Sequence, residues 1–148
     1  MNNAYMALEF VHPDFGRRPG DAPAREEWGL QLSANRAVSL VHDEAAVRQA
    51  VLLLLTTRPG ERLMRPEYGC MLHTLLFSPN DDTTAGLAMH YVRQALERWE
   101  PRIRILRLDA GRNPAFGEVL DISLEYQVLA TNRIEQMSLP VALAGEGL

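Results

Sequence analysis

The run EVLDISLEYQVL at residues 118–129 decides the fold class, because apolar and polar residues alternate through its centre. In an extended chain successive side chains point to opposite sides, so this alternation separates an apolar side from a polar one. The pattern is typical of an antiparallel strand with one face buried and the other in water. The two sides are Leu120, Ile122, Leu124, Tyr126 and Val128 against Asp121, Ser123, Glu125 and Gln127.

Flanking segments complete a predicted meander of three strands. Residues 103–108 form one strand, in which a change of phase at Ile105 and Leu106 indicates a bulge or burial on both faces. After a turn at residues 131–133 the chain returns over residues 134–143, with alternate apolar residues on one face. A further short strand is expected at residues 36–41.

Two helices are expected before the meander. The first covers residues 43–55, with Asp43 as N-cap and Glu44 in the first turn. The second covers residues 83–99, because polar residues at 80–82 offer a cap and Pro101 disfavours helical geometry before it. We therefore predict an α+β fold, two main helices packed on a mostly antiparallel sheet of three to four strands.

The domain organisation follows from the distribution of Pro and Gly. Residues 1–28 are rich in both and are expected to form an N-terminal extension, and residues 29–148 a single domain. The 148-residue chain has a net charge of −4, which argues against nucleic-acid binding. Its longest apolar run, residues 50–55, is far shorter than a membrane span, so no direct membrane insertion is expected.

A search for catalytic and metal-binding patterns finds none with the required spacing. Phosphate-binding, nucleophile-elbow and zinc-protease motifs are absent from the sequence. Cys70 and His73 lack a second pair of ligands for zinc. Glu97 and Glu100 can approach each other, but the arginines beside them favour ionised carboxylates, which are poor general acids. We therefore expect no catalytic residue, no cofactor and no metal.

Two segments are candidates for recognition. Residues 58–69, RPGERLMRPEYG, place two Pro and two Gly among charges, so this backbone is restricted before binding and loses little entropy on binding. Residues 99–102, WEPR, lie at the predicted helix-to-strand junction, where Pro101 fixes the directions of Glu100 and Arg102. From the residues alone, both segments can equally be rigid internal turns whose charges pair with each other.

The segments TRPGERLMRPEYGC (57–70), LLF (75–77) and ALERWEPRI (95–103) together resemble the W-type, gene-25-type baseplate wedge family. That family occurs in contractile phage tails, phage-tail-like injection systems and type VI secretion. The resemblance implies a fold like the interlocking domain of the sheath protein. It also implies a structural role: members lie around the central spike hub in six-fold arrangement, clamp the larger wedge subunits and form the platform for the first ring of inner sheath protein.

The expected protein interface combines the family's Glu-Pro-Arg triplet with the restricted loop, namely Glu100, Pro101 and Arg102 with Arg62, Arg65, Pro66, Tyr68 and Gly69. A sheath arm is expected to add a strand to an exposed sheet edge, with residues 134–143 as the candidate. The alternative function is a peptidoglycan-cleaving, lysozyme-like tail enzyme. We expect assembly in the cytoplasm into a phage tail or a tail-like particle, whether released or membrane-attached.

Overall fold

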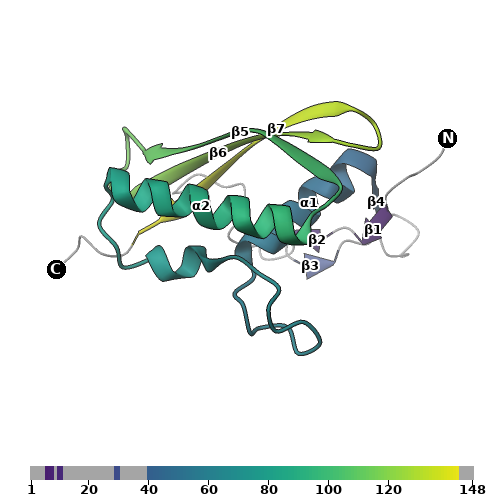
Figure 1. Ribbon diagram of the computed structural model, residues 1–148, viewed down its shortest axis with the longest axis horizontal. Helices are drawn as coiled ribbons and strands as arrows, with labels where there is room; N and C mark the ends of the chain where they lie inside the picture. Colours follow the sequence, from purple (N-terminus) through teal and green to yellow (C-terminus); the bar gives the residue numbers. More distant parts are fainter. Residues whose placement is uncertain (1–5, 9, 12–28, 31–39, 144–148) are drawn as a thin grey trace.

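The computed structural model describes residues 6–8, 10–11, 29–30 and 40–143 of the chain (Figure 1). Its main sheet has the antiparallel order β5–β6–β7, and two two-stranded ribbons, β1–β4 and β2–β3, accompany it. The predicted α+β class is confirmed. In chain order the elements are β1 (Met6–Leu8), β2 (Phe10–Val11), β3 (Gly29–Leu30), β4 (Leu40–His42), α1 (Asp43–Thr56), the 3-10 helix η2 (Met71–Leu75), α2 (Asp82–Trp99), β5 (Ile103–Arg112), β6 (Val119–Val128) and β7 (Arg133–Ala142).

The elements stack in layers below the sheet. Helix α2 crosses one face of the sheet and packs on β5 and β6, while η2 packs on the opposite side of α2 (Figure 1). Helix α1 contacts α2 and continues directly from β4. The loop between α1 and η2 projects away from the sheet, at the bottom of Figure 1. This arrangement leaves the second face of the sheet uncovered by either helix.

Strand β6 forms the centre of the core, as its alternation predicts. All five residues of its apolar side are buried, and the polar residues between them lie on the opposite face. Burying each such side chain stabilises the fold by about 1.5–3 kcal/mol. The expected bulge in the first strand is also confirmed, because the β5–β6 register shifts by one residue at Leu106.

Helix α2 ends at Trp99, as the sequence predicts, and begins one residue earlier than predicted, at Asp82 instead of Thr83. Asp81 is the N-cap, and its carboxylate accepts a 2.8 Å hydrogen bond from the Thr84 backbone N–H. Hydrogen bonds from the Thr84 backbone and hydroxyl lower the pKa of Asp81, which keeps the cap ionised. The helix ends at Trp99, and Glu100 is its C-cap, whose N–H still donates to the Leu96 carbonyl at 2.9 Å.

The predicted N-cap of α1 is wrong by one residue. The extended N-cap is His42, and Asp43 is already the first helical residue, with a φ of 48°. The reason is that β4 runs into the helix without a loop, since His42 still pairs with Met6 across the β1–β4 ribbon. Glu44 lies in the first turn as expected.

The segment predicted as an extension contains two short strands. β1 pairs with β4 and β2 pairs with β3, so both strands of the extension pair with segments after residue 28. Most of the predicted strand at residues 36–41 lies outside the described residues, and β4 overlaps its end. Within the described ranges, no helix is both long and apolar enough to cross a membrane.

Candidate protein-interaction surface

The loop at residues 57–70 is closed on itself by backbone hydrogen bonds. The Cys70 N–H donates to the Thr57 carbonyl at 2.9 Å, which joins the two ends of the loop. Nearer its tip, the Gly60 N–H donates to the Pro66 carbonyl at 2.6 Å. These bonds bridge the two arms of the loop, so the prediction of a restricted backbone is confirmed.

Gly69 makes the close approach of the two arms possible. Its φ of +141° lies in the region that favours glycine. A Cβ at this position would lie 2.8 Å from the Pro59 nitrogen and closer still to the Thr57 carbonyl oxygen. Gly69 is buried, so it sets the shape of the loop and does not itself lie at the surface.

Aromatic and charged contacts fasten the loop to the C-terminal end of α2. The Tyr68 and Trp99 rings meet edge to face, with centroids 5.4 Å apart. The Arg62 guanidinium lies over the Tyr68 ring, 4.2 Å from its centroid, and Arg98 lies over Trp99 at 4.9 Å. Arg98 also forms an ion pair with Glu67. The loop and the helix-to-strand junction, 30 residues apart in sequence, therefore form one continuous surface.

The triplet at the junction contains a nearly buried ion pair. Arg102 Nε and Nη2 donate to the two carboxylate oxygens of Glu100, at 2.6 and 2.9 Å. The Glu100 side chain is only 6% exposed and that of Arg102 is 31% exposed, while Pro101 is exposed. The two charges of the triplet pair with each other, as one of the sequence alternatives supposed. Glu100 thereby holds the Arg102 guanidinium in one orientation at the surface.

We name residues 57–70 together with Glu100–Arg102 the loop–triplet surface. Among its predicted members, Arg62, Arg65 and Pro66 are exposed, and Tyr68 is half-buried. The structure thus brings the two predicted segments together.

Sequence reasoning missed the two most exposed large apolar side chains of the described residues, which stand at the tip of this loop. Leu63 is 96% exposed and Met64 is 93% exposed. Both lie between Arg62 and Arg65, which are also exposed. An apolar pair in the middle of a charged, Pro- and Gly-bounded loop was the signal that could have revealed them.

The hydrogen-bond register shows which groups face the outer edge of β7. The Leu143 N–H donates to the Glu118 carbonyl, so the odd-numbered residues of β7 bond to β6. The even-numbered residues direct their backbone groups away from β6. Pro140 agrees with this register, because a proline without an N–H is tolerated on the outer side of an edge strand. The expected strand-accepting edge is therefore the outer edge of the described sheet, where the backbone groups of Gln136 and Ser138 point away from β6.

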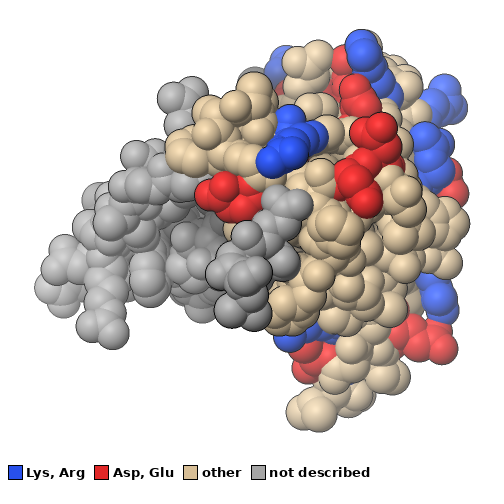
Figure 2. Space-filling model, turned by 90° about the vertical axis from the view of Figure 1, so that its left-hand side faces the viewer, with Lys and Arg blue, Asp and Glu red and all other residues tan. Residues whose placement is uncertain are grey.

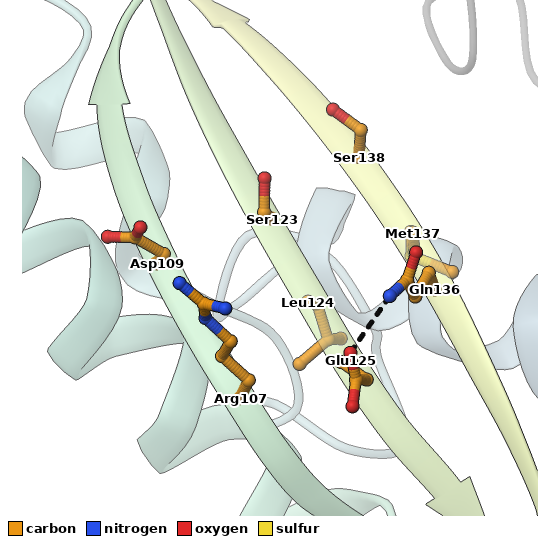
Figure 3. A pocket seen from close by; sticks show the side chains of 8 residues that line it. All are labelled: Arg107, Asp109, Ser123, Leu124, Glu125, Gln136, Met137 and Ser138. Carbon is orange, nitrogen blue, oxygen red and sulfur yellow. Dashed lines mark hydrogen bonds between the residues drawn. The ribbon is translucent and has the colours of Figure 1, made fainter.

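The uncovered face of the sheet forms a shallow polar hollow (Figure 3). A side-chain hydrogen bond between two of its lining residues runs from Gln136 Nε2 to Glu125 Oε2 at 2.8 Å. Acidic and basic side chains are also interspersed on the face seen in Figure 2. The polar side chains of the hollow come from all three strands, namely Arg107, Asp109, Ser123, Glu125, Gln136 and Ser138.

Each carboxylate considered for catalysis forms an ion pair or a hydrogen bond with another side chain of the protein. Glu97 lies on the exposed side of α2, 4.0 Å from Arg93, while Glu100 is held by Arg102. On the sheet, Asp121 accepts from Asn113 at 2.7 Å, as Glu125 does from Gln136.

Cys70 is a buried thiol in the core. Burial raises the pKa of Cys70 to about 11, and the sulfur lies 3.5 Å from the Tyr91 carbonyl oxygen. His73 Nδ1 lies 3.3 Å from the Cys70 carbonyl oxygen, not at the sulfur. Over the part of the chain that the structure describes, no three His, Cys, Asp or Glu side chains gather in a way that could hold a metal ion.

Comparison with known proteins gives consistent matches. The family model "Baseplate wedge protein gp25" matches residues 41–133. Baseplate wedge protein gp25 of Enterobacteria phage T4 is 28% identical over 115 residues, which cover 76% of this chain and 86% of that protein.

Two solved structures share the fold. One, from Geobacter sulfurreducens and provisionally named a tail lysozyme, is 36% identical with a TM-score of 0.67, and covers 75% of this chain and 100% of its own. The other is a chain of the anti-feeding prophage baseplate, 21% identical with a TM-score of 0.67, covering 86% of this chain and 89% of that one. The family model spans more than half of the chain and includes the whole loop–triplet surface and all of β6. The chain therefore belongs to the gp25 family of baseplate wedge proteins.

Proposed function

We propose that the protein is a structural component of the baseplate of a contractile injection particle, in which the loop–triplet surface binds the larger wedge subunits. Family membership supports a structural role over an enzymatic one. The proposal rests mainly on the contact between Tyr68 and Trp99, which holds the loop against the residue that precedes the triplet. A surface that is already ordered loses little entropy on binding.

The exposed groups of this surface indicate the chemistry of the partner. Leu63 and Met64 offer apolar side chains that gain free energy only when a partner covers them. Arg62 and Arg65 flank them, so the complementary site is an apolar pocket rimmed by carboxylates. Arg102, oriented by Glu100, adds a guanidinium at the base of the loop. We propose such a pocket on the larger wedge subunits.

The sheath platform uses a different part of the molecule. We propose that an arm of the inner sheath protein adds a strand to the outer edge of β7, where backbone donors face away from β6. The protein would stand in six copies around the central spike hub, each copy offering one edge to the first sheath ring. Assembly would take place in the cytoplasm, into a phage tail or a tail-like particle.

The wedge contact can be tested with a variant that leaves the fold intact. Replacing both Leu63 and Met64 by serine removes apolar surface that is almost wholly exposed in the free protein, so stability should stay within about 0.5 kcal/mol. Particles carrying this variant should lack assembled baseplates in electron micrographs. Leu87→Ser, an exposed leucine on α2, is the matched control and should assemble normally. Normal baseplates with the double variant would refute the proposed contact.

The lysozyme-like alternative rests on the provisional name of the Geobacter sulfurreducens relative. A retaining glycosidase needs two carboxyl groups about 5–5.5 Å apart, one of them protonated at neutral pH. Here both carboxylate oxygens of Glu100 accept hydrogen bonds from the Arg102 guanidinium, so neither is directed at a substrate. Incubating the purified protein with peptidoglycan and measuring released reducing sugar tests the alternative. Release that Glu97→Gln or Glu100→Gln abolishes would establish the enzyme instead.

A further inference from the structure

The two outer edges of the sheet differ in how they avoid unwanted pairing. Exposed strand edges are templates for association with other chains, and proteins usually block them with bulges, prolines or charged side chains. The β5 edge has the bulge at Leu106. The β7 edge has Pro140. Before that proline, the residues whose backbone groups point away from β6 are all uncharged, namely Ile134, Gln136 and Ser138. Between Arg133 and Pro140 the β7 edge therefore has neither a bulge nor a proline, and Glu135 is the one charged residue of that stretch.

Helix α1 supplies a contact to this stretch of β7. Arg48 Nη1 donates a 3.1 Å hydrogen bond to the Gln136 carbonyl, one of the backbone groups that point away from β6. One turn earlier on the helix, Glu44 lies 3.5 Å from Arg133 at the start of β7. These two side chains bridge α1 to β7, and the bond of Arg48 occupies an acceptor that an added strand would need.

We propose that the Arg48 side chain blocks strand pairing at the β7 edge. Its hydrogen bond keeps a second copy of this chain from pairing with β7 until the sheath strand displaces the guanidinium. The idea rests on the proposed function in that the sheath strand is the intended occupant. Arg48 is itself exposed, so its side chain can swing away without disturbing the core. The hydrogen bond uses only the Gln136 carbonyl as acceptor, so one backbone N–H of an arriving strand can replace the Arg48 donor there.

A second copy is the competitor that the geometry favours. Residues 134–138 carry outward donors and acceptors at every second position, so the edge is complementary to itself about a two-fold axis through Gln136. In such a pair Glu135 lies opposite Met137 of the second copy, so no like charges stand directly opposite each other within residues 134–138. Copies that gather in one baseplate meet at high local concentration. Among the described residues, the Arg48 contact, the Glu44–Arg133 ion pair and Pro140 then limit the pairing.

Self-association of the purified full chain tests whether Arg48 blocks pairing at the β7 edge. Pairing about the two-fold axis breaks the Arg48 bond in both copies, and two hydrogen bonds of about 0.7 kcal/mol each correspond to about tenfold in the dimer dissociation constant. We therefore expect Arg48→Ala to lower the dimer dissociation constant about tenfold in sedimentation velocity. Arg48→Lys, which keeps a donor, should restore most of the wild-type value. Arg93→Ala, an exposed arginine on α2, should match wild type.

A second substitution shows whether the β7 edge is responsible. Adding Gln136→Pro to Arg48→Ala removes an outward N–H that makes no bond to β6, so the double variant should return to the wild-type association. Equal association of Arg48→Ala and wild type, or a dimer that persists in the double variant, would overturn the proposal. The proposed sheath contact is judged separately, by whether Ser138→Pro particles carry sheaths, and their normal appearance would refute that contact alone.

Discussion

Replacing Arg102 should destabilise the fold more than replacing its partner Glu100, although both changes break the same ion pair. Arg102→Ala leaves a carboxylate whose side chain is 6% exposed without either of its two donors at 2.6 and 2.9 Å. Breaking a buried pair on one side costs about 3–5 kcal/mol, and the 31% exposure of Arg102 places this pair at the low end, about 3 kcal/mol. Glu100→Ala leaves a guanidinium that still reaches water, so it should cost about 1 kcal/mol.

Thermal unfolding of the purified chain measures the difference. At about 4 °C per kcal/mol for a chain of this length, Arg102→Ala should lower Tm by about 12 °C and Glu100→Ala by about 4 °C. The double variant should unfold close to Glu100→Ala, because no unpaired carboxylate remains. Arg104→Ala, an exposed arginine on β5, serves as the control and should leave Tm nearly unchanged. A Tm for Glu100→Ala at or below that of Arg102→Ala would refute the reasoning from burial.

We also expect specific changes in stability on β6, in the loop at Gly69 and at the buried Cys70. Leu124→Asp places a charge on the buried side of β6 and should unfold the domain, whereas Glu125→Lys on the opposite face should change stability by less than about 0.5 kcal/mol; equal shifts in thermal denaturation would contradict the assignment of faces. Gly69→Ala should cost at least about 3 kcal/mol by urea denaturation, because its Cβ would overlap backbone atoms, while Gly111→Ala meets open space and should be nearly neutral. Above pH 9 the unfolded Cys70 thiol loses its proton while the folded thiol keeps it up to about pH 11, so stability should fall between these values by about 2.7 kcal/mol; Cys70→Ala should lack this part of the fall, and an identical pH profile for the two proteins would contradict it.

The local pattern of the sequence determined the elements and their faces. Alternation along β6 predicted which of its side chains are buried, and the phase change at Leu106 predicted the bulge, because a strand has a period of two whatever packs on it. Asp81 and Pro101 predicted both ends of α2, since capping and proline geometry act over a few residues. The loop and the triplet were predicted as candidate surfaces for the same local reason, the restriction of their backbones.

Tertiary structure alone decided how these pieces meet. The contact of Tyr68 with Trp99, the burial of Glu100 and the reach of Arg48 to β7 each join residues whose proximity depends on how the helices lie on the sheet. Residue type gives no distance between such groups, so the sequence left open whether the charges of the triplet face a partner or each other. The same limit hid Leu63 and Met64, because the direction in which a loop projects is set by the body that holds its two ends, not by the residues at its tip.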